Sequence, residues 1–405
     1  MSSCRACLKE RMLSFLPLGT HPPANAFLTA EELERPEFAA SLDTHVCLDC
    51  GLVQVPDRVP PEFFRNYLYV PSAAEATHVH FRRLAERVRS DTADGDHLLV
   101  DIGCNDGLFL SEAGTLGCRV LGIEPAANLA AMARARGVEV FNEYFGRDTA
   151  LDVRERYGPA HTIVTTNTFN HIDDLHGFMS GVVTLLDERG TFVIEVPHAL
   201  DYVEKNEFDT VYHEHVSTFT LKSLVDLFSH FGLVVSDVEP ISIHGGSMRV
   251  FGRRAAVSQP GVAPGQWLAR ELEAGLFDPA TYDAFRQRVE KLRLDLCALL
   301  NDLKQAGRRI AGYGAPAKGN TLLNYCGIGP DTLDFLADRN RLKHGLYSPG
   351  MHIPIVPAEE VLKQQPDYLL ILAWNFADEI RLQQEEFRRR GGQFILPIPE
   401  PVVVS

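Results

Sequence analysis

The sequence predicts an α/β protein with two parallel-sheet domains behind a small cysteine-bearing lobe. Two C-x-x-C pairs predict the lobe, and two segments in which an apolar run leads through a glycine loop into a helix-like stretch, VDIGCNDG and IAGYGAPAKGN, predict the sheets. With 405 residues and 45% hydrophobic side chains, the chain is too long for one core. We expect a lobe over 1–70, a larger sheet domain over 71–255, a helical linker over 256–309 and a smaller sheet domain over 310–405.

The net charge and the N-terminus restrict the classes of partner. A formal charge of −15 argues against nucleic acid or an anionic membrane, because phosphate groups are bound mainly through Lys and Arg. The stretch MSSCRACLKE lacks the apolar core of a signal peptide, and no stretch approaches the roughly 20 apolar residues of a membrane helix. We therefore expect a cytoplasmic protein without nucleic-acid or membrane partners, whose oligomeric state the sequence leaves open.

Four of the eight cysteines predict a metal site. Cys4 with Cys7, and Cys47 with Cys50, form two C-x-x-C pairs, and Gly51 follows the second pair. Four thiolates at this spacing suit tetrahedral Zn²⁺, and a site with four protein ligands is structural. The alternatives are packing residues without a metal, or a redox pair. We expect the zinc to fold a lobe that cannot otherwise build a core.

The stretch HLLVDIGCNDGLFL predicts a buried strand, a glycine loop and a helix. Its pattern is D-x-G-x-x-x-G rather than the dinucleotide fingerprint G-x-G-x-x-G. A second strand, RVLGIEP, ends in Glu124, where a carboxylate can accept both hydroxyls of a ribose. An acid at each strand end and a wider loop favour S-adenosylmethionine over NAD. The expected cofactor-binding residues are Asp101, Gly103, Asn105, Asp106, Gly107 and Glu124.

Further strands bring polar side chains to the same sheet edge. HTIVTTNTFNHI and TFVIEVP predict parallel strands, and residues 233–254 predict a closing hairpin. In sheets of this kind ligands bind at the carboxyl ends of the strands. Asn167 and His171 follow one strand, and the cluster Tyr212 to His215 follows the next. We therefore expect both groups to face the cofactor.

The stretch FDTVYHEHVSTFT places Tyr212, His213, Glu214 and His215 in consecutive positions. Beside a methyl sulfonium, a neutral imidazole makes a nucleophile by removing a proton next to a carbonyl, provided that the enolate oxygen is stabilised. We interpret His215 as the base, with Glu214 as its orienting carboxylate or a hydroxyl acceptor. Tyr212 or a tyrosine of NYLYVPS would donate to the oxyanion. The pattern also allows two metal-binding histidines or ordinary surface residues.

The C-terminal third predicts a second nucleotide-type fold. Residues 266–309 read as amphipathic helix with a turn at FDPATY. IAGYGAPAKGN then begins a strand, glycine loop and helix unit, in which loop amides and Lys318 would cradle a pyrophosphate. LDFLADRN predicts the next strand and leaves Asp338 near a ribose or base. The alternative is a glycine loop that serves only for packing.

Two nucleotide-type pockets allow two classes of enzyme. In one, S-adenosylmethionine binds the larger sheet domain and a nucleotide-linked substrate the smaller one, which makes a methyltransferase. In the other, the smaller domain binds NAD in a dehydrogenase or epimerase of nucleotide sugars, although its loop lacks the third glycine at the expected place. A zinc-ribbon adaptor without catalysis is disfavoured by the two cofactor-like folds and by the negative charge.

Six motifs resemble those of the sugar C-methyltransferases of deoxysugar biosynthesis. They are the cysteine pairs, VDIGCNDG, NTFNHI, FDTVYHEH, HGGSMRVF and GYGAPAKGNTLLNYCGIGP, in this order over nearly the whole chain. The resemblance implies a zinc-binding lobe, a central class I methyltransferase domain and a C-terminal Rossmann-like domain that helps to hold the nucleotide sugar. It also implies methyl transfer from S-adenosylmethionine to C3 of a nucleotide-linked 4-keto-6-deoxyhexose.

The resemblance also implies roles for single residues. Those that it places around the keto sugar are His215 as the base, Glu214, Tyr212, Asn167, His171, Tyr67 and Tyr69. Those that match contacts to the nucleotide sugar are Lys318, Asn324 and the stretch from His244 through Gly245 to Arg249.

Overall fold

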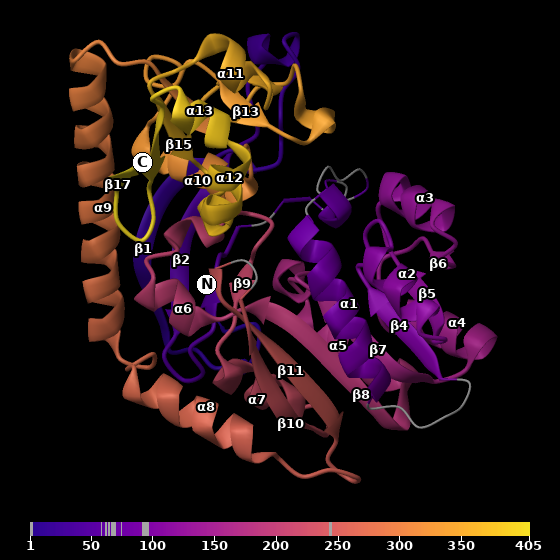
Figure 1. Cartoon of the computed structure of the whole chain (residues 1–405). Coiled ribbons are helices and arrows are strands. Elements are labelled where there is room, and N and C mark those ends of the chain that lie inside the picture. The colour runs from indigo at the N-terminus through magenta and orange to yellow at the C-terminus, as the bar shows by residue number, and fades with distance from the viewer. Residues whose placement is uncertain are drawn as a thin grey trace.

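Three β-sheets organise the chain. The computed structural model describes residues 3–405 except 58, 61–62, 64, 66–69, 74, 91–96 and 243–244, and at 73 and 75 it describes the backbone only. The sheets have four, seven and six strands. Figure 1 shows the C-terminal sheet above the central one, with the long N-terminal strands running beside both. The predicted fold class, a small lobe and two largely parallel sheets, is confirmed.

The N-terminal sheet borrows a strand from the central part of the chain. Its order is β1 (Met12–His21), β2 (Ala40–Cys47), β3 (Val53–Gln54) and β9 (Ser217–Thr218), all antiparallel. Since β9 begins two residues after His215, this sheet holds one end of the Tyr212 to His215 turn. The short helix η1 (Glu32–Glu34) lies between β1 and β2. The lobe is thus built into the molecule rather than appended to it.

The central sheet has the order β10-β11-β8-β7-β4-β5-β6. Its strands are β4 (Leu98–Ile102), β5 (Arg119–Ile123), β6 (Val140–Phe141), β7 (Ala160–Thr166), β8 (Leu186–Pro197), β10 (Leu233–Ile241) and β11 (Ser247–Arg254). The pairs from β6 to β8 are parallel, whereas β11 and β10 add an antiparallel edge, as expected for the hairpin. The strand order reverses between β4 and β7, and ligands bind at such a switch point.

Helices cover both faces of the central sheet (Figure 1). They are α1 (Glu75–Ser90), α2 (Leu108–Thr115), α3 (Ala127–Ala135), α4 (Arg147–Tyr157), α5 (Leu175–Leu185), α6 (Ala199–Glu204) and α7 (Leu221–Ser229), with the short helices η3 (Pro71–Ala73), η4 (Phe169–His171) and η5 (Phe208–Thr210). The strand β4 is buried along its whole length, which is why it reads as a continuous apolar run around one acid.

Two helices lead from the central to the C-terminal sheet. They are α8 (Val262–Glu273) and α9 (Pro279–Gln305), separated at the expected turn, where the Asp278 carboxylate accepts from the backbone amide of Ala280 and caps α9. Helix α9 also completes the core of the N-terminal lobe, because the ring of Phe15 lies 4.8 Å from that of Tyr282. This shared core is the physical reason that the lobe needs partners.

The C-terminal sheet has the order β14-β13-β12-β15-β16-β17 and is parallel except for its last pair. Its strands are β12 (Ile310–Tyr313), β13 (Leu336–Asp338), β14 (Ile355–Pro357), β15 (Tyr368–Ile371), β16 (Gln393–Leu396) and β17 (Val402–Val404). Its helices are α10 (Ala317–Cys326), α11 (Glu360–Gln364), α12 (Ala377–Gln383) and α13 (Glu385–Arg389), with η7 (Arg341–Lys343) and η8 (Trp374–Phe376). Helix α10 begins at the predicted glycine loop.

Within the described part of the chain, no helix has the length and hydrophobicity needed to cross a membrane.

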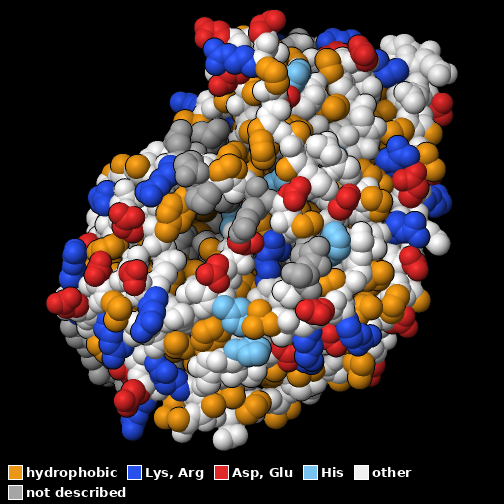
Figure 2. Space-filling model, turned by 180° about the vertical axis from the view of Figure 1, so that it is seen from behind, with side chains coloured by type: hydrophobic (Ala, Val, Ile, Leu, Met, Phe, Trp, Pro, Cys, Tyr) orange, Lys and Arg blue, Asp and Glu red, His pale blue; other side chains and the backbone are white. Residues whose placement is uncertain are grey.

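The face seen in Figure 2 carries acidic and basic side chains interspersed with apolar ones. A mixed surface of this kind offers a large polyanion no continuous basic track on that face.

Candidate active site

A cavity of about 1000 Å³ lies where the three parts of the chain meet. The loops at the carboxyl ends of β4, β5 and β7 form one wall, and the loops after β12 and β13 form another. The predicted site residues on its wall are Asp101, Gly103, Asn105, Asp106, Glu124, Asn167, His171, Tyr212, His215, Lys318 and Asp338. The structure therefore brings the two predicted nucleotide-type loops and the histidine cluster to one cavity.

The glycine loop after β4 is shaped for close approach of a ligand. Gly103 has a φ of +77°, and a Cβ there would lie 2.3 Å from the Oγ1 of Thr168. Asn105 also has positive φ, at +51°, and its backbone amide donates to the Oε2 of Glu124 at 2.9 Å. The Oε1 of Glu124 accepts from the Ala126 amide at 2.9 Å. The Glu124 carboxylate is thereby fixed at the end of β5, and each oxygen keeps a lone pair for a ribose hydroxyl.

Asp101 is a buried acid that lacks a counter-charge within the described chain. It is 2% exposed, and burial, with the negative charges of Glu124 and Glu195, raises its pKa well above the ordinary range. Its Oδ1 has no hydrogen-bond partner among the described residues. A cationic ammonium would supply both the charge and the hydrogen bond, so the site fits the amino-acid end of S-adenosylmethionine. Asp106, fully buried, pairs instead with Arg136 at 3.0 Å.

The turn that carries the histidine cluster holds His215 between two partners. Its Nδ1 lies 3.1 Å from the Thr210 carbonyl oxygen, which only accepts hydrogen bonds, so Nδ1 carries the hydrogen of the neutral ring. The hydroxyl of Tyr212 is hydrogen-bonded to Nε2, and the two rings stack with centroids 3.9 Å apart. In the neutral form of His215 the basic lone pair is therefore on Nε2, at the Tyr212 hydroxyl.

The loop after β7 adds a second imidazole beside the first. The rings of His171 and His215 have centroids 4.9 Å apart. Burial lowers the pKa of His171 to about 4, so this ring is neutral near pH 7 and can donate one hydrogen bond without carrying charge. Asn167 has a φ of +51°, and its backbone amide donates to the Glu195 carbonyl oxygen at 2.8 Å. That bond fixes the start of the loop to β8.

The other two cluster members have mainly structural contacts. His213 is fully buried, and its Nε2 bonds the carbonyl oxygen of Ala40 at 3.0 Å, which ties the turn to β2. Glu214 is also fully buried and is not among the described residues that line the cavity. Its Oε2 accepts from the Nδ2 of Asn25 at 2.7 Å. Among the described residues, no histidine belongs to a cluster with the geometry of a metal site.

The C-terminal wall contributes cations more than acids. Lys318 is buried beside Trp374, with its Nζ 4.7 Å from the ring centroid, and burial lowers its pKa against the opposing charges of Asp209 and Glu207. Asp338 accepts from the backbone amides of Ala315 and Asn340, each at 2.7 Å. Asp338 thus connects the glycine loop with the loop after β13, and because it also lines the cavity, its expected contact with a ribose or base stays a prediction.

Some predicted residues lie away from the cavity. Arg249 donates to Glu195 at 2.6 Å and to Glu239 at 2.9 Å, so it links β11 to its neighbours within a buried ionic network. Asn324 donates to the carbonyl oxygens of Asn320 and Pro349. Gly107 packs toward Ala133, and Gly245 packs toward Glu207. None of these four predicted residues, Gly107, Gly245, Arg249 and Asn324, is among the described residues that line the cavity. Tyr67, Tyr69 and His244 lie outside the described residues.

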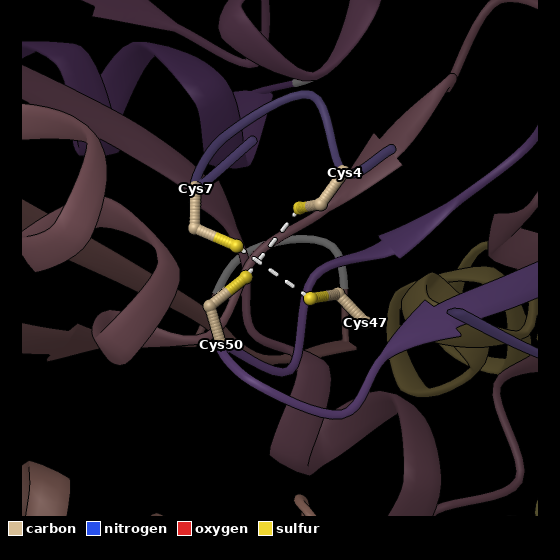
Figure 3. A group of neighbouring side chains, drawn as sticks. All are labelled: Cys4, Cys7, Cys47 and Cys50. Carbon is tan, nitrogen blue, oxygen red and sulfur yellow. Dashed lines mark hydrogen bonds between the residues drawn. The ribbon is translucent and has the colours of Figure 1, made fainter. Parts of the chain in front are cut away.

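The four N-terminal cysteines converge on one point (Figure 3). Cys4 and Cys50 have sulfurs 3.5 Å apart, Cys7 and Cys47 have sulfurs 3.6 Å apart, and all four sulfurs lie within 4.8 Å of one another. A zinc tetrahedron with zinc–sulfur bonds of about 2.3 Å has edges of about 3.8 Å. The four cysteines are buried, and their geometry fits Zn²⁺.

Sequence reasoning missed several residues near the cavity. Asn25 and Lys343 lie on its wall, and Glu207 and Asp209 lie next to Lys318. Asn25 lies in a loop after two prolines, and Lys343 ends the three-residue helix η7, so neither has a periodic signal. Glu207 and Asp209 lie just before the Tyr212 to His215 cluster in the chain, and only their burial distinguishes them from ordinary surface acids.

Comparisons with known proteins place the chain among methyltransferases. Three family models match: "Putative zinc binding domain" over residues 4–64, "Methyltransferase domain" over 75–238 and "C-methyltransferase C-terminal domain" over 242–399. C-methyltransferase NovU of Streptomyces niveus is 38% identical over 411 residues, covering 100% of this chain and 97% of NovU. A ubiquinone biosynthesis O-methyltransferase of Rhodopseudomonas palustris (strain BisA53) is 29% identical over 24% of this chain and 38% of its own.

Among solved structures, magnesium protoporphyrin IX methyltransferase (ChlM) of Synechocystis PCC 6803 with bound SAH has a TM-score of 0.35 and 11% identity, covering 44% of this chain and 82% of that one. The family assignment depends instead on NovU, which matches along nearly the full length of both chains. The glycine loop after β4 and the fixed Glu124 carboxylate, at the switch point of the central sheet, agree with that match. The chain belongs to the family of S-adenosylmethionine-dependent C-methyltransferases.

Proposed function

We propose that the protein methylates C3 of a nucleotide-linked 4-keto-6-deoxyhexose, with His215 as the base that forms the enolate. The observation that carries this proposal is an imidazole on the cavity wall whose Nδ1 faces a carbonyl oxygen and whose Nε2 meets the Tyr212 hydroxyl, so that in its neutral form the lone pair is on Nε2. A base of this kind can take a proton from carbon only if that carbon is acidified, as it is next to a ketone.

The central domain would hold the cofactor through residues already fixed in place. Asp101 would meet the ammonium group, the Gly103 turn would allow close approach of the amino-acid part, and Glu124 would accept from the ribose. When bound, S-adenosylmethionine supplies an electrophilic methyl group to the enolate carbon. Holding both partners in one cavity contributes through effective molarity.

The catalytic turn would perform the proton transfer. In the structure the Tyr212 hydroxyl is bonded to the His215 Nε2. We propose that the sugar displaces this bond, so that Nε2 removes the C3 proton while the Tyr212 hydroxyl donates to the C4 oxygen. The neutral His171 ring, next to His215, would give a second hydrogen bond to that developing oxyanion.

The C-terminal wall would hold the nucleotide end of the substrate. Three cationic side chains on that wall, Lys318, Arg339 and Lys343, supply positive charge suited to a diphosphate. The loop amides near Gly314 lie at the start of α10, where a helix end also favours an anion. In this arrangement the sugar points toward His215, and the nucleotide lies against the C-terminal domain.

The N-terminal lobe would carry a structural zinc. The four buried cysteines Cys4, Cys7, Cys47 and Cys50 supply all four ligands, so we propose no reaction step for the metal. The metal would hold together the two segments that carry the cysteines, which we call the cysteine knuckle. One segment precedes β1, and the other runs from the end of β2 to β3.

Isotope exchange tests the function directly. The enzyme is incubated in deuterated water with keto sugars carried on different nucleotides, with and without S-adenosylmethionine, and the products are analysed by NMR. We expect deuterium at C3 without the cofactor and a methyl group at C3 with it. The ketone at C4 also acidifies C5. Deuterium and a methyl group at C5 would therefore show that the enzyme methylates C5 instead of C3. The absence of both with every sugar would contradict the proposal.

His215→Ala tests the base. We expect methyl transfer to fall by at least about 100-fold, because a general base contributes ~10²–10⁴-fold, while binding of S-adenosylhomocysteine measured by calorimetry stays near that of the wild type. His230→Ala, at an exposed histidine at the end of α7, is the matched control. Turnover near the wild-type rate in His215→Ala would remove His215 from this role.

A further inference from the structure

A short segment after β1, residues 22–28, joins the N-terminal lobe to the C-terminal domain. The Nδ2 of Asn320 donates to the Ala24 carbonyl oxygen at 2.7 Å. Leu28 and Tyr347 exchange two backbone hydrogen bonds, at 3.1 and 2.8 Å. The Nζ of Lys343 lies 4.8 Å from the centroid of the Phe27 ring. These contacts fix the segment on the C-terminal wall of the cavity on both sides of Asn25.

Asn25 extends from this segment to the catalytic turn. Its Nδ2 donates to the Oε2 of Glu214 at 2.7 Å. Asn25 lines the cavity, whereas Glu214 is fully buried and is not among the described lining residues. Asn25 therefore connects the cavity wall with a buried carboxylate.

The hydrogen bond fixes which way the amide faces. Because the Asn25 nitrogen donates to Glu214, the carbonyl oxygen on the same carbon is directed away from the carboxylate. An amide oxygen is an acceptor, and the ring of a sugar presents hydroxyl donors. Lys343 places a positive charge near the same carboxylate, as the effect of Glu214 on its pKa indicates. Asn25 and Lys343 thus both lie near the Glu214 carboxylate, and Asn25 is hydrogen-bonded to it.

We propose that Asn25 contacts the substrate, its carbonyl oxygen accepting from a ring hydroxyl of the sugar, and that Glu214 is a positioning residue that holds the Asn25 amide. This inference rests on the proposed function and deepens it. It gives the N-terminal lobe a direct part in recognising the sugar, and it moves the hydroxyl contact expected of Glu214 to Asn25.

The test compares kcat/KM for a keto sugar and for its deoxy analogues, each with one ring hydroxyl removed. We expect the wild type to prefer the complete sugar over one analogue by at least about tenfold, since an unpaired polar group in the site is costly. Asn25→Ala should lower kcat/KM for the complete sugar about 10-fold to 100-fold and abolish the preference. Glu214→Gln should cost less, and the double variant should be no worse than Asn25→Ala, because the pair acts as a unit.

Asn25→Asp supplies a readout that a purely structural role would not move. It places a second carboxyl group against Glu214, and two adjacent carboxylates favour sharing a proton. We expect its activity to recover as the pH is lowered, with a pH profile displaced toward acid. Asn301→Asp, at an exposed position of α9, adds the same charge elsewhere and should keep the wild-type profile.

Binding of S-adenosylhomocysteine reports whether each variant is folded. Wild-type kcat/KM in Asn25→Ala, a preference for the complete sugar that survives in it, or multiplying effects in the double variant would overturn the inference. So would loss of S-adenosylhomocysteine binding in every Asn25 variant, which would make the residue structural. A wild type inactive on every sugar refutes the proposed function, and this inference falls with it; an active wild type with unaffected variants refutes the inference alone.

Discussion

At the scale of single residues, the cavity is surrounded by buried charges of both signs. Burial raises the pKa of Glu207 to about 7 and that of Asp209 to about 6, although the nearby Lys318 ammonium opposes both shifts. The Oδ2 of Asp209 accepts from the Trp374 Nε1 at 2.7 Å. Lys205 and Asp201 also act on Glu207, with opposite signs. Such a cluster stabilises the fold only while its positive and negative charges balance. That balance depends on how many of its carboxyl groups are protonated.

Glu207 gives a prediction about stability. Its pKa in the folded protein, about 7, exceeds its ordinary value of 4.5, so the folded state binds the proton more tightly than the unfolded state. The stability that this proton contributes is complete below about pH 4.5 and is lost as the pH rises to about 7. At pH 8, Glu207→Gln should therefore unfold at a higher denaturant concentration than the wild type. Its free energy of unfolding should be greater by about 3 kcal/mol at most.

Denaturant unfolding between pH 4 and pH 8 measures the difference. The two proteins should converge toward pH 4, where the wild-type carboxyl group is protonated in both states. Glu204→Gln, at an exposed position of α6, should track the wild type throughout. A Glu207→Gln protein no more stable than the wild type at pH 8 would contradict this reading of the cluster.

At the scale of elements, the strand, loop and helix unit after β4 is built around glycine. Gly103 needs both a left-handed backbone and empty space, because Thr168 fills the position that a Cβ would take. The first strand of the C-terminal sheet repeats the design, since Gly314 has a φ of +85° before α10. There, Asp338 accepts one backbone amide on each carboxylate oxygen, as Glu124 does in the central sheet, so the two similar sequence patterns fix their acids in the same way.

Gly103→Ala tests the loop. The added methyl group would meet the Thr168 Oγ1 at 2.3 Å, so the loop must shift, and we expect the affinity for S-adenosylhomocysteine to fall at least about tenfold. Gly117→Ala is the matched control: its φ is +80°, and no described atom lies within 4 Å of the added Cβ. The control should lose only about 1 kcal/mol of stability from backbone strain. Equal affinities in calorimetric titrations of the two variants would contradict the role of close approach.

At the scale of the whole molecule, the segment that carries Cys4 and Cys7 is connected to the Tyr212 to His215 turn. Arg5, between the first two cysteines, donates to the carbonyl oxygen of Val216 at 3.0 Å and to that of Val55 at 2.7 Å. It also pairs with Asp173 at 3.0 Å, in the loop after β7. Val216 directly follows His215, so disorder around the four cysteines would affect the proposed base through Arg5 and through β9.

Removing the metal should therefore affect catalysis as well as stability. On our proposal that a zinc ion folds the lobe, we expect Cys47→Ser to lose the metal, to unfold at a lower temperature and to transfer methyl at least about tenfold more slowly. Cys118→Ser, at a half-buried cysteine outside the cluster, should retain both metal and activity. Metal analysis and thermal unfolding of the two variants provide the check. A metal-free protein with full activity would contradict the coupling.

The sequence by itself determined the fold class, the convergence of the four cysteines and the glycine loop after β4, because each depends on local features: apolar runs, spaced cysteines and glycines between a strand and a helix. It also indicated that Tyr212 and His215 belong together, since both lie in one turn. Patterns confined to a few neighbouring residues can be recognised without knowing how the rest of the chain folds.

Only the tertiary structure decided which side chains share the cavity. Arg249 looked available in sequence, but Glu195, which is distant in the chain, engages it. Asn25 had no local signal, yet it reaches Glu214 across a separation of 189 residues. Contacts of this kind depend on how the lobe, the central sheet and the C-terminal domain pack together. Long-range packing places charges and hydrogen-bond partners that no short stretch of sequence encodes.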